Sequence, residues 1–425
     1  MSQQNPRDAN FDHESPYSAA PTSATAAMAG GLPTVRLKPR KSRPFYGRHP
    51  WVLDSAVESI TGLPGDGDAV QLLNEKGKFI ATGYYNSQSR IRVRLYSWNP
   101  TEALDEAWLA GKIVAAIELR RQLGLLEPSS AARMIFSESD GLSGLIVDRL
   151  GDYLAIQVNA LAMARRLPQI IPILQRELRP HGIVIKQERG IGPLEGVHLP
   201  PETHWGELPA APLTITEHHI KYAVDLRTGQ KTGFYIDQRD NRRAAAKYAS
   251  GRRVLDMFCY SGGFGLNCLV HGDAQSVLAV DSSAAALHLA GENARLNHTS
   301  DWHSQQADAF DHLAGLATGP ERFGLVVLDP PKFANKRSAV DEALMAYHRL
   351  NRLAVELLEP QGILVTCCCS GHVLREDFLH MLGGVAQRSG RDLQILEQRG
   401  AAADHPVSAT CLETEYLKCV ICRVG

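Results

Sequence analysis

The first 258 residues of this 425-residue chain contain no cysteine. All eight cysteines lie after that point, and three of them are adjacent, at Cys367, Cys368 and Cys369. A secreted domain stapled by disulfides spaces its cysteines along the chain, so this distribution excludes such a scaffold and predicts reduced thiols.

Long apolar runs are also missing. No run approaches the roughly 20 residues that span a bilayer, and the first thirty residues lack the apolar stretch of a secretory signal. We therefore expect a cytoplasmic protein with no membrane partner. Hydrophobic residues make up 44% and charged residues 21%, which excludes wholesale disorder. The chain is too long for one core, so we expect two or three domains.

Net charge is nearly absent, at −1, but its distribution is uneven. Residues 34–98 hold eleven Lys and Arg against five Asp and Glu, a local net charge of +6. Such asymmetry favours a polyanion partner, although a solvated charged face would look the same. The candidate RNA-binding residues of this basic stretch are Arg36, Lys38, Arg40, Lys41, Arg43 and Arg48.

The first half of the chain divides by composition. Residues 1–33 are polar and without apolar periodicity, which predicts a disordered tail. Short apolar segments broken by turn residues predict a β-rich domain over 34–98. Residues 99–200 are expected to form a linking helix, from 101 to 126 with Thr101 as its N-cap, and a small α+β domain. A Pro-rich linker is expected over 199–212.

Residues 201–425 alternate strand and helix patterns, which predicts an α/β fold with a doubly wound, Rossmann-like parallel sheet. Ligands of such sheets bind outside the carboxyl ends of the strands. The residues with distinctive chemistry follow the predicted strands, so sequence and topology indicate the same edge.

A cofactor site is expected after the strand at 254–258. This strand runs into a Gly-rich loop and a helix, and Asp281 follows the next strand about 25 residues later, where it can accept hydrogen bonds from ribose hydroxyls. The glycines are expected to let the backbone approach the ligand. The candidate cofactor-binding residues here are Asp256, Phe258, Tyr260, Ser261, Gly262, Gly263 and Asp281.

An acid after the second strand fits both a nicotinamide dinucleotide and S-adenosylmethionine. The loop lacks the G-x-G-x-x-G spacing that holds a pyrophosphate, which favours S-adenosylmethionine. Asp308 follows a third predicted strand, where it could accept from the adenine amino group or could instead cap a helix.

A rigid turn, Asp329-Pro330-Pro331-Lys332-Phe333, follows the fourth strand. Asp329 is expected to hydrogen-bond the edge of a base, or to contact the cofactor, while Phe333 stacks on the base and Lys332 binds RNA. A loop that merely turns is the alternative.

Cys369 follows the fifth strand at the same edge. Methylation of cytosine at carbon 5 requires a nucleophile such as a thiolate, so Cys369 is the candidate, with Lys332 as a candidate for lowering its pKa. A buried cysteine acting as a small hydrophobe is the alternative. Cys419 and Cys422 lack the two further ligands of a structural zinc site, so no metal is expected.

From about residue 34 onwards the chain resembles the RlmI family of 23S ribosomal RNA cytosine-5 methyltransferases. The resemblance is carried by Lys-Thr-Gly-Phe-Tyr-Ile-Asp-Gln-Arg at 231–239, Asp-Pro-Pro-Lys-Phe at 329–333 and Ala-Asp-His-Pro-Val at 403–407. It implies an N-terminal PUA domain for RNA binding (34–98), a small central domain (99–200) and an S-adenosylmethionine-dependent methyltransferase domain (201–425). It implies that the 231–239 and 403–407 segments line the cofactor and RNA clefts.

The same resemblance implies Gln238 and Arg239 as cofactor contacts, Cys369 as the catalytic nucleophile beside Asp329, and 23S ribosomal RNA as the partner. A homodimer remains open. Pro331 stands where two-cysteine RNA methyltransferases hold a second thiol, so the group that removes the carbon-5 proton is not identified. The alternatives are methylation of an exocyclic amine of adenine or guanine, which needs no cysteine, and a non-catalytic RNA-binding assembly factor.

Overall fold

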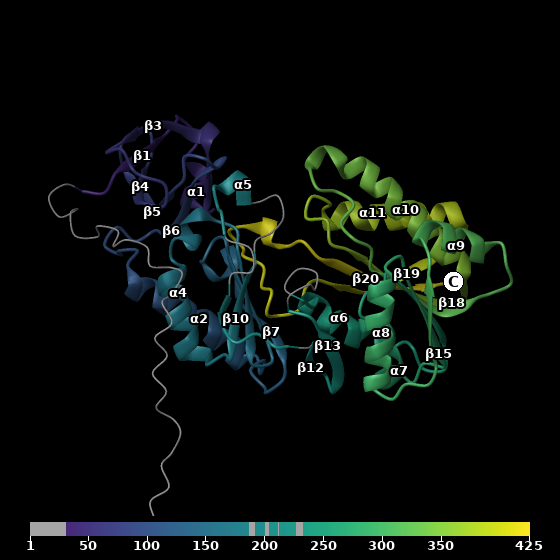
Figure 1. The fold of residues 1–425 in the computed structure, drawn as a ribbon. Coiled ribbons are helices and arrows are strands. Elements are labelled where there is room, and N and C mark those ends of the chain that lie inside the picture. Colours follow the sequence, from purple (N-terminus) through teal and green to yellow (C-terminus); the bar gives the residue numbers. More distant parts are fainter. Residues whose placement is uncertain (1–30, 187–191, 200–203, 211, 227–232) are drawn as a thin grey trace, which may run out of the picture.

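The computed structural model describes residues 31–186, 192–199, 204–210, 212–226 and 233–425. Residues 1–30, which form most of the predicted tail, lie outside this range. The described chain forms two lobes, with the N-terminal and central domains in one and the C-terminal domain in the other (Figure 1). Among the described residues no helix combines the length and apolarity needed to cross a membrane.

The N-terminal domain is a six-stranded sheet in the order β2-β6-β5-β4-β1-β3. Its neighbouring strands are antiparallel except for β1 and β4, which are parallel. Alternating apolar side chains such as Val35, Leu37, Val70 and Leu72 fill its core, as the period-2 pattern predicts. The elements are β1 (Thr34–Leu37), α1 (Arg43–Tyr46), β2 (Trp51–Leu53), β3 (Val57–Thr61), β4 (Ala69–Leu73), β5 (Phe79–Tyr85) and β6 (Ile91–Ser97).

The linking helix α2 spans Glu106–Gln122, and Asp105 is its N-cap. The Asp105 carboxylate accepts a 2.8 Å hydrogen bond from the backbone N–H of Trp108. The prediction of Thr101 as N-cap is therefore wrong. An aspartate satisfies the exposed N–H groups of a helix at least as well as threonine, and the chain turns helical only after it.

The central domain packs α2 and α4 against a five-stranded sheet in the order β11-β10-β9-β8-β7. Its last strand, β11, lies inside the stretch that we expected to be only a linker. It pairs with β10 through Ile183 and Trp205, so part of that stretch belongs to the central sheet. The elements are β7 (Ala131–Phe136), β8 (Leu145–Leu150), β9 (Tyr153–Val158), α3 (Leu161–Ala164), α4 (Leu167–Leu178), β10 (Gly182–Lys186), α5 (Gly192–Glu195) and β11 (His204–Gly206).

The C-terminal domain contains a two-stranded sheet, β12 and β13, and a seven-stranded sheet in the order β16-β15-β14-β17-β18-β20-β19. The five strands from β16 to β18 are parallel, and β20 and β19 extend the sheet antiparallel. The predicted doubly wound α/β fold is confirmed. The strands are β12 (Leu213–Glu217), β13 (Ile220–Val224), β14 (Arg253–Met257), β15 (Ser276–Asp281), β16 (Trp302–Gln306), β17 (Phe323–Leu328), β18 (Leu358–Cys368), β19 (Leu393–Arg399) and β20 (Lys418–Val424).

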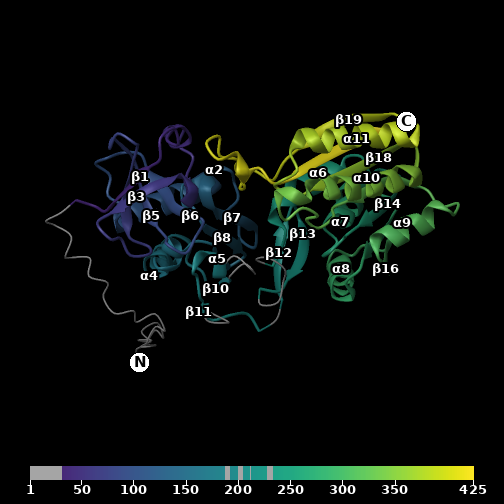
Figure 2. The same cartoon turned by 90° about the horizontal axis from the view of Figure 1, so that it is seen from above.

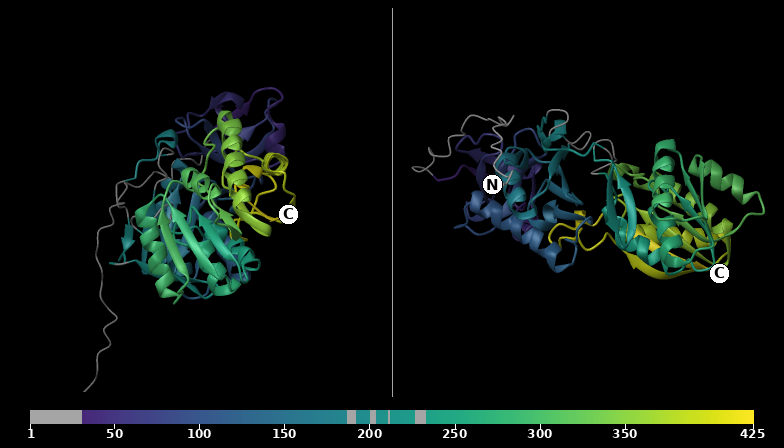
Figure 3. Two further views of the ribbon diagram at one scale, coloured as in Figure 1. Left: turned by 90° about the vertical axis from the view of Figure 1, so that its right-hand side faces the viewer. Right: turned by 60° about the horizontal axis from the view of Figure 1, so that its bottom comes forward.

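Helices cover both faces of the seven-stranded sheet (Figure 3). One apolar core joins the strands to α9, α10 and α11, and a second joins them to α6 and α7. Parallel strands buried on both faces are continuously apolar, as in β17, where every residue is buried. The helices are α6 (Arg239–Ala246), α7 (Gly263–Gly272), α8 (Ala284–Leu296), α9 (Ala309–Ala317), α10 (Val340–Leu357) and α11 (Arg375–Ser389).

Residues 400–417, between β19 and β20, reach back from the C-terminal domain to the other lobe (Figures 1 and 2). We call them the 400–417 segment. The Arg120 guanidinium of α2 donates a 2.7 Å bond to the carbonyl of Asp404 in this segment. Asp404 also accepts a 2.9 Å bond from the N–H of Arg133 in β7. The segment therefore ties the two lobes together with buried polar contacts.

Candidate functional site

The carboxyl ends of four parallel strands lie at one edge of the seven-stranded sheet. Paired registers align β15, β14, β17 and β18 in the same direction. This edge is where ligands of doubly wound sheets bind. The strands end here at Asp281, Met257, Leu328 and Cys368.

The loop after β14 has unusual backbone geometry. Phe258 and Tyr260 have φ values of 61° and 47°, in the left-handed region that non-glycine residues seldom adopt. The Tyr260 N–H donates to Asp281 Oδ2 at 3.0 Å, and the buried Ser261 offers its carbonyl to Asn293 Nδ2 at 2.9 Å. Strain held in place by such bonds is common at ligand sites, so the loop is a preformed feature of the edge.

The loop's glycines have a different reason from the one expected. A Cβ at Gly262, which has a φ of 82°, would lie 2.8 Å from the Trp302 ring. A Cβ at Gly263 would lie 2.5 Å from Nε of Arg242. The structure therefore requires glycine at both positions because the protein's own side chains pack against them, whether or not a ligand approaches.

Asp256 is almost fully buried at the end of β14. Its Oδ2 accepts a 2.9 Å bond from the Gly265 N–H, while its Oδ1 has no hydrogen-bond partner among the described residues. Burial raises the pKa of Asp256 to about 7, and the charges of Asp329 and Asp281 act in the same direction. A buried carboxylate oxygen without a donor is costly, so this position fits a ligand that brings a donor or a positive charge.

We predict that Asp256→Asn stabilises the fold at pH 8 more than at pH 5. The folded pKa of about 7 lies above the unfolded value of about 3.9, so this group's contribution to stability is lost as pH rises through 7. The gain is bounded by about 4 kcal/mol, at 1.36 kcal/mol per pKa unit. Urea unfolding of both proteins at the two pH values measures it, and an equal effect at both would contradict a raised pKa.

Both acids that follow the next strands are bound to backbone N–H groups. Asp281 Oδ1 accepts from the Ser283 N–H at 2.9 Å. Asp308 caps α9, and its Oδ1 accepts from the N–H groups of Phe310 and Asp311 at 2.9 and 3.1 Å. The structure thus gives Asp308 the capping role that the sequence left as its alternative; its contact with adenine stays a prediction.

Gln238 connects the 231–239 segment to the catalytic edge. Its side chain is buried, and its Nε2 donates to Asp329 Oδ1 at 2.9 Å. Its Oε1 accepts from Asn241 Nδ2 at 2.7 Å. Gln238 therefore orients the Asp329 carboxylate. Residues 231 and 232 of the segment lie outside the described residues.

The structure does not bring Arg239 to this edge as a contact for a ligand. Its guanidinium is 5% exposed and donates to Asp404 at 3.0 and 3.2 Å and to the Ala131 carbonyl at 3.3 Å. Asp404 comes from the 403–407 motif and is itself fully buried. A paired guanidinium serves the lobe interface, so the expectation of a cofactor contact at Arg239 is corrected. The pairing spans 165 residues, which local sequence patterns cannot reveal.

Cys369 differs from the other cysteines in exposure. All eight cysteines lie in the described part of the chain; seven are buried and Cys369 alone is partly exposed. Its Sγ lies 3.6 Å from the carbonyl oxygen of Pro330, in the turn after β17. The thiol and Asp329 therefore stand on adjoining loops at the same edge, as the sequence predicts.

A buried lysine lies behind this thiol. Lys418 is 2% exposed and stands opposite Cys368 in the β18–β20 pairing. Its Nζ donates to the carbonyls of Ser370 at 2.8 Å and Tyr416 at 3.0 Å. Burial lowers the Lys418 pKa, while the nearby thiols act to raise it. Sequence reasoning named Lys332 instead, which is exposed; a lysine at the start of an apolar strand was the signal for Lys418.

The aromatic wall of the edge is also different from the prediction. Phe333 is partly buried against the sheet's helices, with its ring centroid 4.8 Å from that of Tyr347 and 6.4 Å from that of Phe310. A ring packed in this way is largely used within the core, so its expected stacking on a base is corrected. Tyr235 is the better candidate, because Asp329 and Cys369 are close enough to raise the pKa of its phenol, after burial as the main cause.

The six basic residues from Arg36 to Arg48 are all exposed on the N-terminal domain. Only Lys38 has a printed role within the fold, a 3.0 Å bond from Nζ to the carbonyl of Ser55. Arg40 and Arg48 have φ values of 65° and 64°. The arm is thus a charged surface and not part of a core, and RNA binding by it stays a prediction.

Comparisons with known proteins agree with this arrangement. Residues 35–98 match the family of PUA-like domains, and residues 202–410 match the S-adenosylmethionine-dependent methyltransferase family. A solved putative methyltransferase in complex with SAH is similar over 92% of this chain and 99% of its own, with a TM-score of 0.79 and 19% identity. A putative SAM-dependent methyltransferase from Streptococcus mutans has a TM-score of 0.78 with the same coverage and identity. At that identity the likeness shows the fold.

Curated relatives are closer in sequence. A ribosomal RNA large subunit methyltransferase I from Erwinia tasmaniensis is 38% identical over 395 residues, 92% of this chain and the whole of that protein. Proteins of the same name from Citrobacter koseri and Escherichia coli are 36% and 37% identical over the same length. With the acidic and thiol side chains at the sheet's edge, these matches show that the chain belongs to the ribosomal RNA large subunit methyltransferase I family, which uses S-adenosylmethionine.

Proposed function

We propose that this chain transfers a methyl group from S-adenosylmethionine to carbon 5 of a cytosine in 23S ribosomal RNA, with Cys369 as nucleophile. The shared name of the curated relatives supports ribosomal RNA of the large subunit as the substrate. The observation that carries the chemistry is the partly exposed Cys369 thiol beside the turn of Asp329 and Pro330.

The reactivity of cytosine explains why a thiol is needed. Carbon 5 is not nucleophilic in the free base. The Cys369 thiolate forms a bond from sulfur to carbon 6, and the electrons of the 5,6 double bond make carbon 5 enamine-like. Bound S-adenosylmethionine supplies an electrophilic methyl carbon. Loss of the carbon-5 proton to a base then restores the double bond and releases the thiolate from carbon 6.

The surrounding groups fit this role. The Asp329 carboxylate, oriented by Gln238, can accept from the cytosine amino group, the pairing that acids make with this base. Tyr235 supplies an aromatic ring near the thiol, set edge-on to Tyr260 with ring centroids 5.2 Å apart. Asp256 and Asp281 would hold the cofactor, Asp256 because one of its buried oxygens lacks a donor.

The nucleoside product tests this proposal. The protein is incubated with protein-free 23S RNA and labelled S-adenosylmethionine, and the modified nucleoside is identified by mass spectrometry. We expect 5-methylcytidine. A methylated exocyclic amine of adenine or guanine would replace the proposal with the alternative chemistry, and cofactor binding without any methylated RNA would mean that the target is wrong.

We assign Lys418 as a positioning residue for the thiolate. Its ammonium is buried, and it forms no salt bridge with a carboxylate within the described residues. A buried cation without an anion is unfavourable, and a thiolate at Cys369 would supply the missing charge. The ammonium also holds the Ser370 carbonyl and so fixes the backbone next to Cys369.

We predict that Lys418→Met moves the pH midpoint of Cys369 alkylation upward by about one unit, because an opposite charge nearby favours the thiolate. Iodoacetamide labelling across pH, followed by peptide mass spectrometry, measures the midpoint at Cys369. Lys332→Met is the matched control on the exposed loop and should move it by far less. A shift in the control but not in Lys418→Met would assign the role to Lys332 instead.

A further inference from the structure

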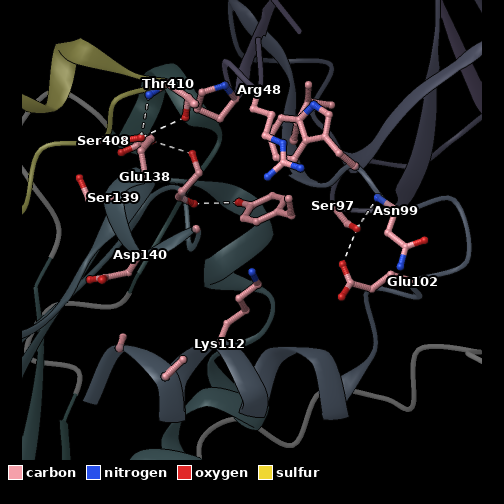
Figure 4. A pocket seen from close by; sticks show the side chains of 18 residues that line it. Arg48, Ser97, Asn99, Glu102, Lys112, Glu138, Ser139, Asp140, Ser408 and Thr410 are labelled. Atoms are coloured by element: carbon pink, nitrogen blue, oxygen red, sulfur yellow. Dashed lines mark hydrogen bonds between the residues drawn. The ribbon is translucent and has the colours of Figure 1, made fainter. Parts of the chain in front are cut away.

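A hollow of about 610 Å³ lies where the N-terminal domain, α2 and the 400–417 segment meet, away from the strand edge that holds Cys369. Figure 4 shows its walls: Arg48, Ser97 and Asn99 from the N-terminal domain, Lys112 from α2, and Ser408 and Thr410 from the 400–417 segment. Its volume is in the range of sites for small ligands or single nucleotides.

The carboxylates that line this hollow are already committed. Glu138 accepts from the Ser143 hydroxyl at 2.7 Å and pairs with Arg94 at 3.4 Å. Asp140 pairs with the buried Arg120 at 2.7 Å. The third, Glu102, accepts from the Ser97 hydroxyl, as Figure 4 shows. Their negative charge is therefore largely satisfied within the protein.

The cations of the hollow are not committed in this way. Among the described residues, neither Arg48 nor Lys112 forms a salt bridge, although three carboxylates line the same walls. Lys112 rises from α2 toward the open space, while Arg48 stands on the opposite wall (Figure 4). Two uncommitted cations facing one hollow provide what a phosphate group needs.

The hollow also continues a charged surface. Arg48 is the last residue of the exposed basic stretch that starts at Arg36, so the cations of that surface lead directly to the hollow. Trp98 lines the hollow and is only partly buried, with its Nε1 fixed by a 2.7 Å bond to the Phe45 carbonyl. A positive track that ends at a held aromatic ring is typical of single-stranded nucleic-acid sites.

We propose that this hollow binds a phosphate-bearing nucleotide from a single-stranded segment of the RNA substrate. Arg48 and Lys112 contact the phosphates, and the Trp98 ring contacts the base. A duplex is too wide to enter, so the site selects an unpaired segment. This inference rests on the proposed function in taking RNA as the substrate, but it concerns binding and not the methylation chemistry.

Equilibrium binding of a protein-free 23S RNA transcript across a salt series tests it. Arg48→Met and Lys112→Met keep apolar stems and remove the charges. Each should weaken binding about five- to tenfold and reduce the slope of log K against log salt by about 0.7, the value for one phosphate contact on a single strand. Lys247→Met, an exposed cation at the end of α6, is the control and should change neither quantity as much.

Lysine acetylation of the wild-type protein gives a readout that needs no variant. A short single-stranded oligoribonucleotide should protect Lys112 and leave Lys247 reactive, while an RNA duplex of equal charge should protect Lys112 poorly. Unchanged binding in both variants, or equal protection by the duplex, would overturn the inference. If no 5-methylcytidine forms but Lys112 is protected, the proposed chemistry fails while this site stands.

Discussion

Cys369→Ala is expected to reduce methyl transfer to 23S RNA by at least about 10³-fold, because the thiolate adds to carbon 6 and no other group does so. Cys369 is the one partly exposed cysteine of the eight, and the two that precede it in the run are fully buried. The other thiols therefore cannot replace it without a large rearrangement of the sheet.

Transfer of label from S-adenosylmethionine, at saturating RNA, measures this loss. Cys368→Ala is the control, since it removes the neighbouring thiol from the core and leaves the nucleophile in place. Cofactor affinity, measured by calorimetry, should be similar in both variants. Retention of activity by Cys369→Ala would contradict the thiol mechanism and favour methylation of an exocyclic amine.

Asp404→Ala is expected to destabilise the fold by about 3–5 kcal/mol, because it leaves buried cations without their partner. Asp404 is fully buried, receives the Arg239 guanidinium and the Arg133 N–H, and stands 3.0 Å from His405 Nδ1. Burial alone would raise its pKa, but the charges of His405 and Arg239 hold it well below its usual value.

The sign of the pH dependence follows from that pKa. The folded value lies below the unfolded value of about 3.9, so the stability that Asp404 contributes is present above pH 4 and is lost as pH falls below it. Urea unfolding at pH 7 measures the loss in Asp404→Ala. Glu118→Ala, which breaks an exposed pair with Arg121, is the control and should cost at most about 1 kcal/mol. Equal losses in the two variants would contradict the network.

Periodicity and strand order were sufficient to predict the edge of the site. Apolar strands that end in Asp281, Asp329 and Cys369 predict their own meeting, because parallel strands place their carboxyl ends together. The thiol of Cys369 was found in this way. The α/β class and the methyltransferase fold were likewise accessible from the sequence, since they depend on patterns within a few tens of residues.

The remaining residues depend on contacts that the local pattern does not encode. The use of Phe333 was settled by the packing of Tyr347 behind it, and that of Arg239 by an acid 165 residues away. Gly262 is required by the Trp302 ring and not by a ligand. Lys418 was overlooked because its significance comes from the register that sets β20 against β18.

The most direct test of the account is a covalent trap. In 23S RNA transcribed with 5-fluorocytidine, the fluorine at carbon 5 cannot leave as a proton does, so the adduct formed at carbon 6 persists after methyl transfer. We predict a denaturation-resistant complex that requires S-adenosylmethionine, with the linked nucleotide on Cys369 after protease and nuclease digestion. A methylated product with no such complex, or a link to another residue, would contradict Cys369 as the nucleophile.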